Sequence, residues 1–157
     1  MKVLDLQNGK QHTVTSRSNY FAPDIDQEGK RIAAVDVQPG GYATLQILDA
    51  STGAVIKKIP NPQQFFYTYP KFYTDQSIVS AIRNKKGGMT LGLVNIRDGA
   101  VQELLPWSMN VIGFPFVQGD TITFTASYKE QDGLFAFVGN KLFKLNTSSV
   151  NAGTGNY

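Results

Sequence analysis

Few side chains in this sequence have the chemistry for catalysis or metal binding. The chain of 157 residues has no Cys and a single His, His12. These counts exclude disulfides, thiolate zinc sites, a Cys nucleophile and any metal site built from several histidines of this chain. A lone His without a partner is typical of a surface position rather than of a catalyst.

Acidic side chains near predicted hairpin turns are the next candidates, because clustered carboxylates can bind Ca²⁺. They are Asp24, Asp26, Asp75 and Asp120. No loop alternates oxygen ligands and ends on a late Glu, as a calcium loop does, so we predict that these carboxylates cap turns. The sequence also lacks a Gly-x-Ser-x-Gly elbow and a phosphate-binding loop. We therefore predict no catalytic residue, no metal site and no cofactor, and hence no enzyme within this chain.

The composition limits the classes of partner. The chain is 41% hydrophobic, enough for a packed core, and 17% charged, against about 25% in an average protein. Its formal net charge of +3 is too small to indicate a nucleic-acid partner. No apolar run approaches the ~18 residues of a membrane span, and the N-terminus has no apolar signal stretch. We expect neither a nucleic-acid partner nor a direct membrane span.

The elements that position these residues are predicted to be strands. Short β-branched and aromatic runs alternate with turn residues, and no segment shows sustained helical spacing of apolar residues. Asn8-Gly9, Thr52-Gly53 and Asp98-Gly99 each lie between two apolar runs, as hairpin turns do. Their glycines recur at intervals of 44 and 46 residues.

Two further landmarks keep this interval: a proline at Pro23, Pro70 and Pro115, and an isoleucine at Ile32, Ile78 and Ile122. Four short strands in every ~45 residues is the period of a β-propeller blade. A β-sandwich with evenly spaced hairpins is the alternative, but it would not need the same proline in the first strand of each unit. The fourth strand, for example 55–59, alternates polar and apolar residues, as an outermost strand does.

The repeats divide the chain into a partial propeller. We predict an all-β fold of about three and a half four-stranded antiparallel blades, or about 14 strands. The boundaries are a half blade over 1–16, blades over 19–61, 65–107 and 110–147, and a flexible tail over 148–157. The half blade matches the third and fourth strands of the other units, and the last unit has a shortened third turn at Gly139-Asn140.

One unit carries a family resemblance. Its proline and Asp-rich turn over 22–30, its Ile-Ala run over 31–35 and its closing turn Leu48-Asp49-Ala50-Ser51-Thr52-Gly53 resemble the repeat of TolB-like propellers. The resemblance extends over about 16–145, with degenerate second and third copies. The resemblance implies a bacterial envelope protein, periplasmic or at the cell surface. It also implies that this chain is a fragment of a larger protein, because such propellers close with ~4–8 blades. Similar blades occur in Tol-system proteins and in prolyl-oligopeptidase-like and tricorn-like peptidases.

An open stack of blades leaves apolar faces uncovered at both ends. We expect the rest of a parent chain to cover them. Self-association of two chains through the open blade faces is the alternative.

The connections between the second and third strands, and between one blade and the next, emerge on one face of a propeller, here called the loop face. Function resides on such loops more often than in strands. The candidate binding residues on this face are Arg17, Tyr42, Lys85, Lys86 and Trp107. The two lysines attract an acidic partner or are simply solvated. Aromatic residues around the first strands either pack between blades, the interpretation we favour, or form a stacking platform for sugars or peptides.

The expected function is that of a non-catalytic interaction module, which binds a protein or glycan partner in the cell envelope through the loop face. The alternative is a substrate-gating propeller domain of a multidomain peptidase whose catalytic domain lies outside this chain. A sugar-processing enzyme is a weaker interpretation, because the chain lacks histidines and convergent acids.

Overall fold

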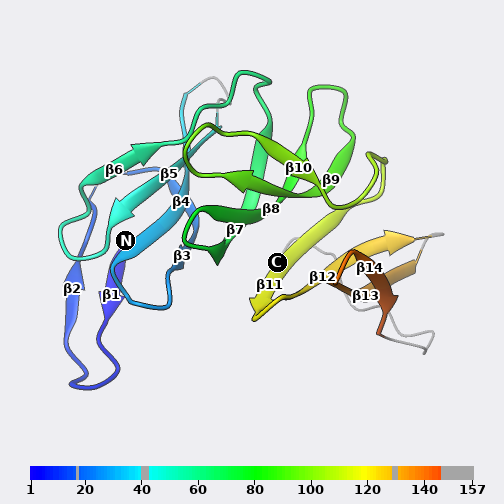
Figure 1. The fold of residues 1–157 in the computed structure, drawn as a ribbon. Helices are drawn as coiled ribbons and strands as arrows, with labels where there is room; N and C mark the ends of the chain where they lie inside the picture. Colours follow the sequence, from blue (N-terminus) through cyan, green and yellow to red (C-terminus); the bar gives the residue numbers. More distant parts are fainter. Residues whose placement is uncertain (17, 40–42, 129–130, 146–157) are drawn as a thin grey trace.

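The computed structural model describes residues 1–16, 18–39, 43–128 and 131–145. They form 14 strands in four antiparallel sheets (Figure 1). These residues contain no helix that is long and apolar enough to cross a membrane. The predicted fold class, a partial β-propeller of about three and a half blades, is confirmed.

The first two sheets are the half blade and blade 1. The half blade pairs β1 (Lys2–Leu4) with β2 (Gln11–Thr13). Blade 1 consists of β3 (Tyr20–Ile25), β4 (Arg31–Val37), β5 (Ala43–Asp49) and β6 (Val55–Lys58). The four strands of blade 1 pair in chain order, so the sheet is a simple meander.

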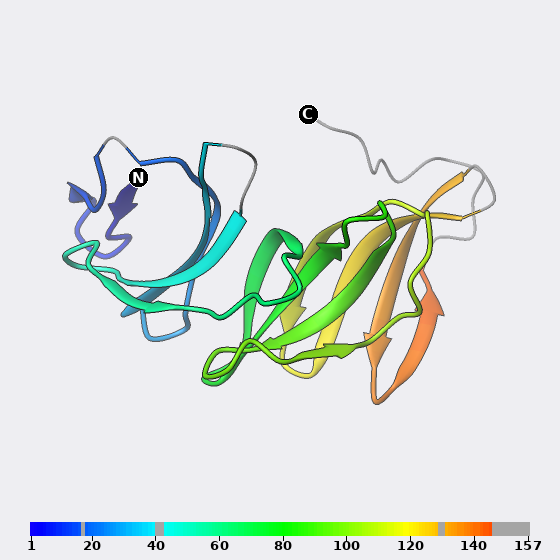
Figure 2. The same cartoon turned by 90° about the horizontal axis from the view of Figure 1, so that it is seen from above.

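Blades 2 and 3 repeat this arrangement. Blade 2 consists of β7 (Phe66–Thr74), β8 (Ser77–Arg83), β9 (Met89–Asn95) and β10 (Val101–Glu103). Blade 3 consists of β11 (Ile112–Gln118), β12 (Thr121–Tyr128), β13 (Gln131–Val138) and β14 (Lys141–Lys144). Seen from above, the blades follow one another in chain order, with blade 2 between the other two (Figure 2). The first strands, β3, β7 and β11, lie next to each other and are the inner strands.

The turns between third and fourth strands share one hydrogen-bond pattern. The amides of Gly9, Gly53 and Gly99 donate to the carbonyl oxygens of Asp5, Asp49 and Asn95 over 2.8–2.9 Å. All three glycines have φ between 69° and 74°, a conformation that favours glycine. Because the β1–β2 hairpin has this same turn, the half blade corresponds to a third and a fourth strand. In blade 3, Gly139 and Asn140 both have positive φ, as a two-residue hairpin turn requires.

The hydrophobic core lies between the blades. Leu45 and Tyr67 belong to the cluster between blades 1 and 2, and Leu91 and Phe124 to the cluster between blades 2 and 3. The second strands β4 and β8 are buried along most of their length, because neighbouring sheets cover both faces. A third cluster joins the half blade to blade 1.

Blade 3 differs from the other blades on the face that points away from blade 2. Ile122 and Phe124 of β12 pack toward blade 2, and Thr123 between them points the other way. Phe116 pairs with Thr123 and is 57% exposed on this open face. Alternation of apolar and polar residues along β12 therefore marks a sheet with one covered face.

Candidate functional site

Each inner strand contains a proline at the same structural position. Pro23, Pro70 and Pro115 lie in β3, β7 and β11, each within an interruption of the pairing with the second strand. The residue before each proline has positive φ: 47° at Ala22, 51° at Tyr69 and 49° at Phe114. The alignment of the three prolines made from the sequence is confirmed.

This conformation is costly for the residues that adopt it. A positive φ is unfavourable for bulky side chains, and a following proline disfavours helical backbone angles further. Tyr69 and Phe114 therefore hold a strained backbone in two neighbouring strands. Bulges of this kind re-aim side chains, and strained residues of this kind concentrate at ligand-binding positions.

The result is a row of aromatic rings across three blades, formed by Phe21, Tyr69 and Phe114 and here called the aromatic row. The ring centroids of Phe21 and Tyr69 are 5.5 Å apart, and those of Tyr69 and Phe114 are 4.6 Å apart. Phe21 is 41% and Phe114 40% exposed. The row thus presents ring surface to solvent instead of closing it inside a core.

A pocket of about 290 Å³ lies beside the aromatic row, at the loop-face end of the inner strands, and is here called the axial pocket. All three rings line it, and Arg83, at the end of β8, contributes a cation. Arg83 is exposed, and within the described residues its Nη2 makes one weak contact, a donation to Met89 Sδ at 3.9 Å. The guanidinium of Arg83 is therefore free to bind a carboxylate or to stack on a ring.

Lys85 and Lys86 lie in the loop that follows Arg83, and both are exposed. Asn84 holds this loop, because its Oδ1 accepts the amides of Lys86 at 2.9 Å and Gly88 at 3.0 Å. The structure therefore brings three cations, Arg83, Lys85 and Lys86, to one end of blade 2. Arg17 and Tyr42, the other loop residues predicted to bind, lie outside the described residues.

The connection from blade 2 to blade 3 is tied to this loop. The amide of Met89 donates to Ser108 O at 2.7 Å, and the amide of Ser108 donates to Met89 O at 3.0 Å. Met109 next to this bridge is 76% exposed and extends its Cε toward Gly87. The loop face thus has an exposed methionine beside the loop that carries Lys85 and Lys86.

Trp107 occupies the edge of the core between blades 1 and 2. Its ring lies 5.4 Å from that of Phe65, and its Nε1 donates to Glu103 Oε1 at 2.6 Å. The indole is half-buried against this core cluster. Trp107 has a packing role here, and a contact with a partner stays a prediction.

The turn acids have structural partners. Asp26 accepts the amides of Lys30 at 2.8 Å and Arg31 at 3.1 Å, and Nε of Arg31 at 2.8 Å. Burial alone would raise the pKa of the Asp26 carboxyl, but these hydrogen bonds outweigh it and hold the pKa below its usual value. Arg31 also donates to Oδ1 of Asp75 at 3.0 Å and so links blade 1 to blade 2. The turn-capping prediction is confirmed for Asp26.

Asp24 makes a second link between blades 1 and 2. Its carboxylate binds Lys71 Nζ at 2.9 Å and accepts the amide of Phe72 at 2.9 Å. Within the described part of the chain, no cluster of three or more His, Asp or Glu side chains is arranged to hold a metal ion.

Neither the place of Arg83 in this site nor the exposure of the aromatic row is predicted by the sequence. Most of the aromatic side chains pack between blades, as favoured, for example Phe65 and Tyr67. The signal that separates Tyr69 and Phe114 from them is the proline that follows each. An aromatic residue directly before a repeated strand proline cannot keep regular strand pairing.

Comparison with solved structures shows which fold this geometry belongs to. The chain is similar to TolB from Acinetobacter baumannii, with a TM-score of 0.72 and 19% identity over 96% of this chain and 38% of that chain. It is also similar to an acylaminoacyl peptidase from Pyrococcus horikoshii, with a TM-score of 0.63 and 16% identity over 91% of this chain and 28% of that chain.

A third likeness is to the β-propeller domain of the trilobed protease from Pyrococcus furiosus, with a TM-score of 0.50 and 12% identity over 92% of this chain and 62% of that domain. No protein-family model and no curated protein sequence matches the chain. The chain therefore has the fold of part of a TolB-like β-propeller, and it spans less than two fifths of the TolB chain.

Proposed function

We propose that this chain is a non-catalytic interaction module that binds a protein segment through its loop face and axial pocket. The observation that carries the proposal is the aromatic row beside the cations of blade 2. Exposed rings give contact area at low entropic cost, and the strained backbone before the prolines holds them in place. Arg83, Lys85 and Lys86 favour a segment with acidic residues.

The cellular setting of this proposal is the bacterial cell envelope, either the periplasm or the cell surface. The resemblance of the repeat to TolB-like propellers supports it. Partners on this reading are envelope proteins, and the remaining blades of a longer chain would extend the pocket. A glycan that stacks on the aromatic row is the competing ligand.

Site-specific photo-crosslinking in cells tests the proposal. A benzophenone amino acid placed at Met109 reports contacts at the loop face, and one at Ile56, which is 55% exposed on β6, reports contacts elsewhere. We expect a protein adduct from position 109 and none from position 56. Phe114→Ala and Arg83→Glu should each abolish the adduct, whereas Phe116→Ala, on the open face of blade 3, should leave it unchanged.

An adduct that survives both Phe114→Ala and Arg83→Glu would overturn the proposed site. Binding of the chain to glycan probes, with no protein adduct, would replace the protein segment by a glycan.

A second candidate is the substrate-gating propeller domain of a peptidase, which the likeness to two peptidase propellers favours. The two candidates differ in whether a catalytic peptidase domain accompanies this propeller. Peptidase activity of the full-length protein would support the gating role. Hydrolase activity of the isolated chain would overturn the non-catalytic assignment in both.

A further inference from the structure

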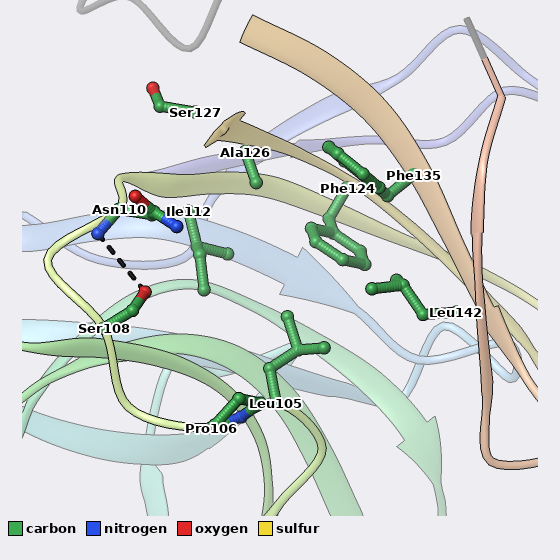
Figure 3. Close-up of a pocket in the computed structure, with 10 residues that line it drawn as sticks. All are labelled: Leu105, Pro106, Ser108, Asn110, Ile112, Phe124, Ala126, Ser127, Phe135 and Leu142. Carbon is green, nitrogen blue, oxygen red and sulfur yellow. Dashed lines mark hydrogen bonds between the residues drawn. The ribbon is translucent and has the colours of Figure 1, made fainter. Parts of the chain in front are cut away.

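A second pocket, of about 230 Å³, lies between blades 2 and 3 (Figure 3). We call it the rim pocket. Leu105 and Pro106 from the end of blade 2 form one wall, and Ile112, Phe124 and Leu142 of blade 3 form the other. Pro106 is exposed and Leu142 is 49% exposed, so the pocket opens to solvent.

Strand register shows what occupies this place in the other blades. The bulge of β11 lies between Gly113 and Phe116, and Ile112 is the residue directly before Gly113. Tyr20 in β3 and Tyr67 in β7 have the same position. Two of three blades therefore have a tyrosine where blade 3 has an isoleucine.

Each tyrosine ring fills space between its own blade and the preceding one. Tyr67 is fully buried between blades 1 and 2, and its hydroxyl donates to Asn61 Oδ1 at 3.3 Å. Tyr20 packs against the cluster between the half blade and blade 1, and its hydroxyl donates to Gln46 Oε1 at 3.0 Å. A phenol ring with a bonded hydroxyl is thus the recurrent filling of an inter-blade wedge in this chain.

Blade 3 lacks this filling at two positions. Ile112 replaces the tyrosine, and its cross-strand neighbour is Ala126, where Tyr67 has Ile82. The missing volume accounts for the rim pocket. Its 230 Å³ exceeds the ~150 Å³ of an engineered apolar cavity that holds benzene.

Polar groups stand at the mouth of the rim pocket. Ser108 and Asn110 line it, and the amide of Asn110 donates to Ser108 Oγ at 3.2 Å (Figure 3). They belong to the connection from blade 2 to blade 3. The corresponding connection from blade 1 to blade 2 supplies Asn61, which accepts the hydroxyl of Tyr67.

We propose that the rim pocket binds the side chain of a tyrosine from a partner peptide, with the phenol ring between Leu105 and Phe124 and the hydroxyl at Ser108 or Asn110. The inserted ring takes the place of the tyrosine that blade 3 lacks. The rim pocket shares only Ile112 with the axial pocket, and this proposal does not depend on the function proposed for the axial pocket.

Titration of the chain with N-acetyl-tyrosinamide, monitored by NMR of the Ile112 and Ala126 methyl groups, tests the proposal. We expect saturable shifts of both methyls, with a Kd on the order of 1 mM for so small a ligand. p-Cresol, the free ring, should shift the same methyls, and toluene should bind several-fold more weakly because it cannot use the polar mouth.

Two variants fill the pocket from within the chain. Ile112→Tyr restores the ring found in the other blades, and Ala126→Ile restores the neighbour of Tyr67. Each should abolish the shift of the reporter methyl that remains, Ala126 in Ile112→Tyr and Ile112 in Ala126→Ile, and should raise the thermal midpoint of unfolding. Phe116→Tyr is the matched control, because it adds a tyrosine to β11 on the opposite face and should leave binding unchanged.

Three results would overturn the proposal. The first is the absence of saturable shifts with N-acetyl-tyrosinamide. The second is equal binding of toluene and p-cresol, which would make the pocket apolar without preference for a phenol. The third is binding that persists in Ala126→Ile or, provided it folds, in Ile112→Tyr.

Discussion

Trp107 illustrates how one side chain combines packing and exposure. Its ring contacts Phe65, its Nε1 donates to Glu103, and the indole remains half-buried. Removal of a fully buried Trp costs ~3–5 kcal/mol, so a half-buried one should cost less. The contact therefore stabilises the junction of blades 1 and 2 without being its centre.

We predict that Trp107→Ala lowers the free energy of unfolding by about 2 kcal/mol, measured by urea denaturation. Trp107→Phe keeps the ring contact with Phe65 and loses only one exposed hydrogen bond, so it should cost about 1 kcal/mol or less. An unchanged unfolding midpoint in Trp107→Ala would instead assign Trp107 to the loop surface alone.

The candidate site was partly predictable from the sequence at this scale. Lys85 and Lys86 follow from a loop signal, because Gly-rich polar stretches between apolar runs are local features. The role of Arg83 was not predictable. Arg83 stands at the end of an apolar strand, and it lines a pocket only because the inner strands of three blades come together beside it. The exposure of Phe21 likewise depends on the position of β7.

At the scale of elements, the turn glycines divide into two kinds. A Cβ atom added to Gly99 would lie 1.9 Å from the carbonyl oxygen of Pro60, at the end of blade 1. A Cβ atom added to Gly9 would meet nothing within 4 Å. Both glycines have nearly equal φ, so the backbone cost of a substitution is the same at both positions. The difference between them therefore measures the close approach of the blade 2 turn to blade 1.

We predict that Gly9→Ala costs about 1–2 kcal/mol of unfolding free energy, the cost of a left-handed residue. Gly99→Ala should cost about 4 kcal/mol, because the turn of blade 2 must move away from Pro60. Chemical denaturation of the two variants measures the difference. Equal losses would show that the turn of blade 2 does not depend on its contact with blade 1.

The strands and their order were predictable, and one detail of register was not. Hairpin turns and the two repeated landmarks depend on nearby residues, so they can be identified in the sequence. The expected alternation along 55–59 is interrupted, because Val55 pairs with Leu48 and Lys57 with its neighbour Ile47. Ile56 is the extra residue of a bulge, which no local pattern marks.

At the scale of the whole molecule, hydrogen-bonded carboxylates couple stability to pH. Hydrogen bonds from Ser51 and Thr52 lower the pKa of Asp49 to about 2 from 3.8, and that of Asp26 is lowered as well. A carboxyl with a lowered pKa in the folded state stabilises that state above its unfolded pKa. This stabilisation is lost as pH falls through the folded pKa.

We predict that the free energy of unfolding falls steadily between about pH 5 and pH 2. Asp49→Asn keeps an oxygen for the turn but cannot titrate, so its stability should fall less steeply over this range. Denaturation curves at several pH values test this. Parallel pH profiles for the wild type and Asp49→Asn would contradict the assignment.

The open face of blade 3 bears on the assembly of the chain. Phe116 is 57% and Phe143 47% exposed there. We predict concentration-dependent self-association of a chain of this length in sedimentation velocity, reduced by Phe116→Lys. Ile56→Lys, at the outer edge of blade 1, is the control and should have no effect. A chain that stays monomeric at all concentrations would contradict this prediction, and further blades instead of a second copy would then be expected to cover this face.

Each blade is an uninterrupted stretch of the chain, and this affects how the protein is made. A ribosome that adds ~5–20 residues per second needs only a few seconds to complete one blade. Blade 1 can therefore pair its four strands before β7 has been synthesised, and each later blade finds a finished neighbour to dock against. Until then the newest blade carries an uncovered apolar side, so nascent chains stalled between blades should be preferred clients of chaperones.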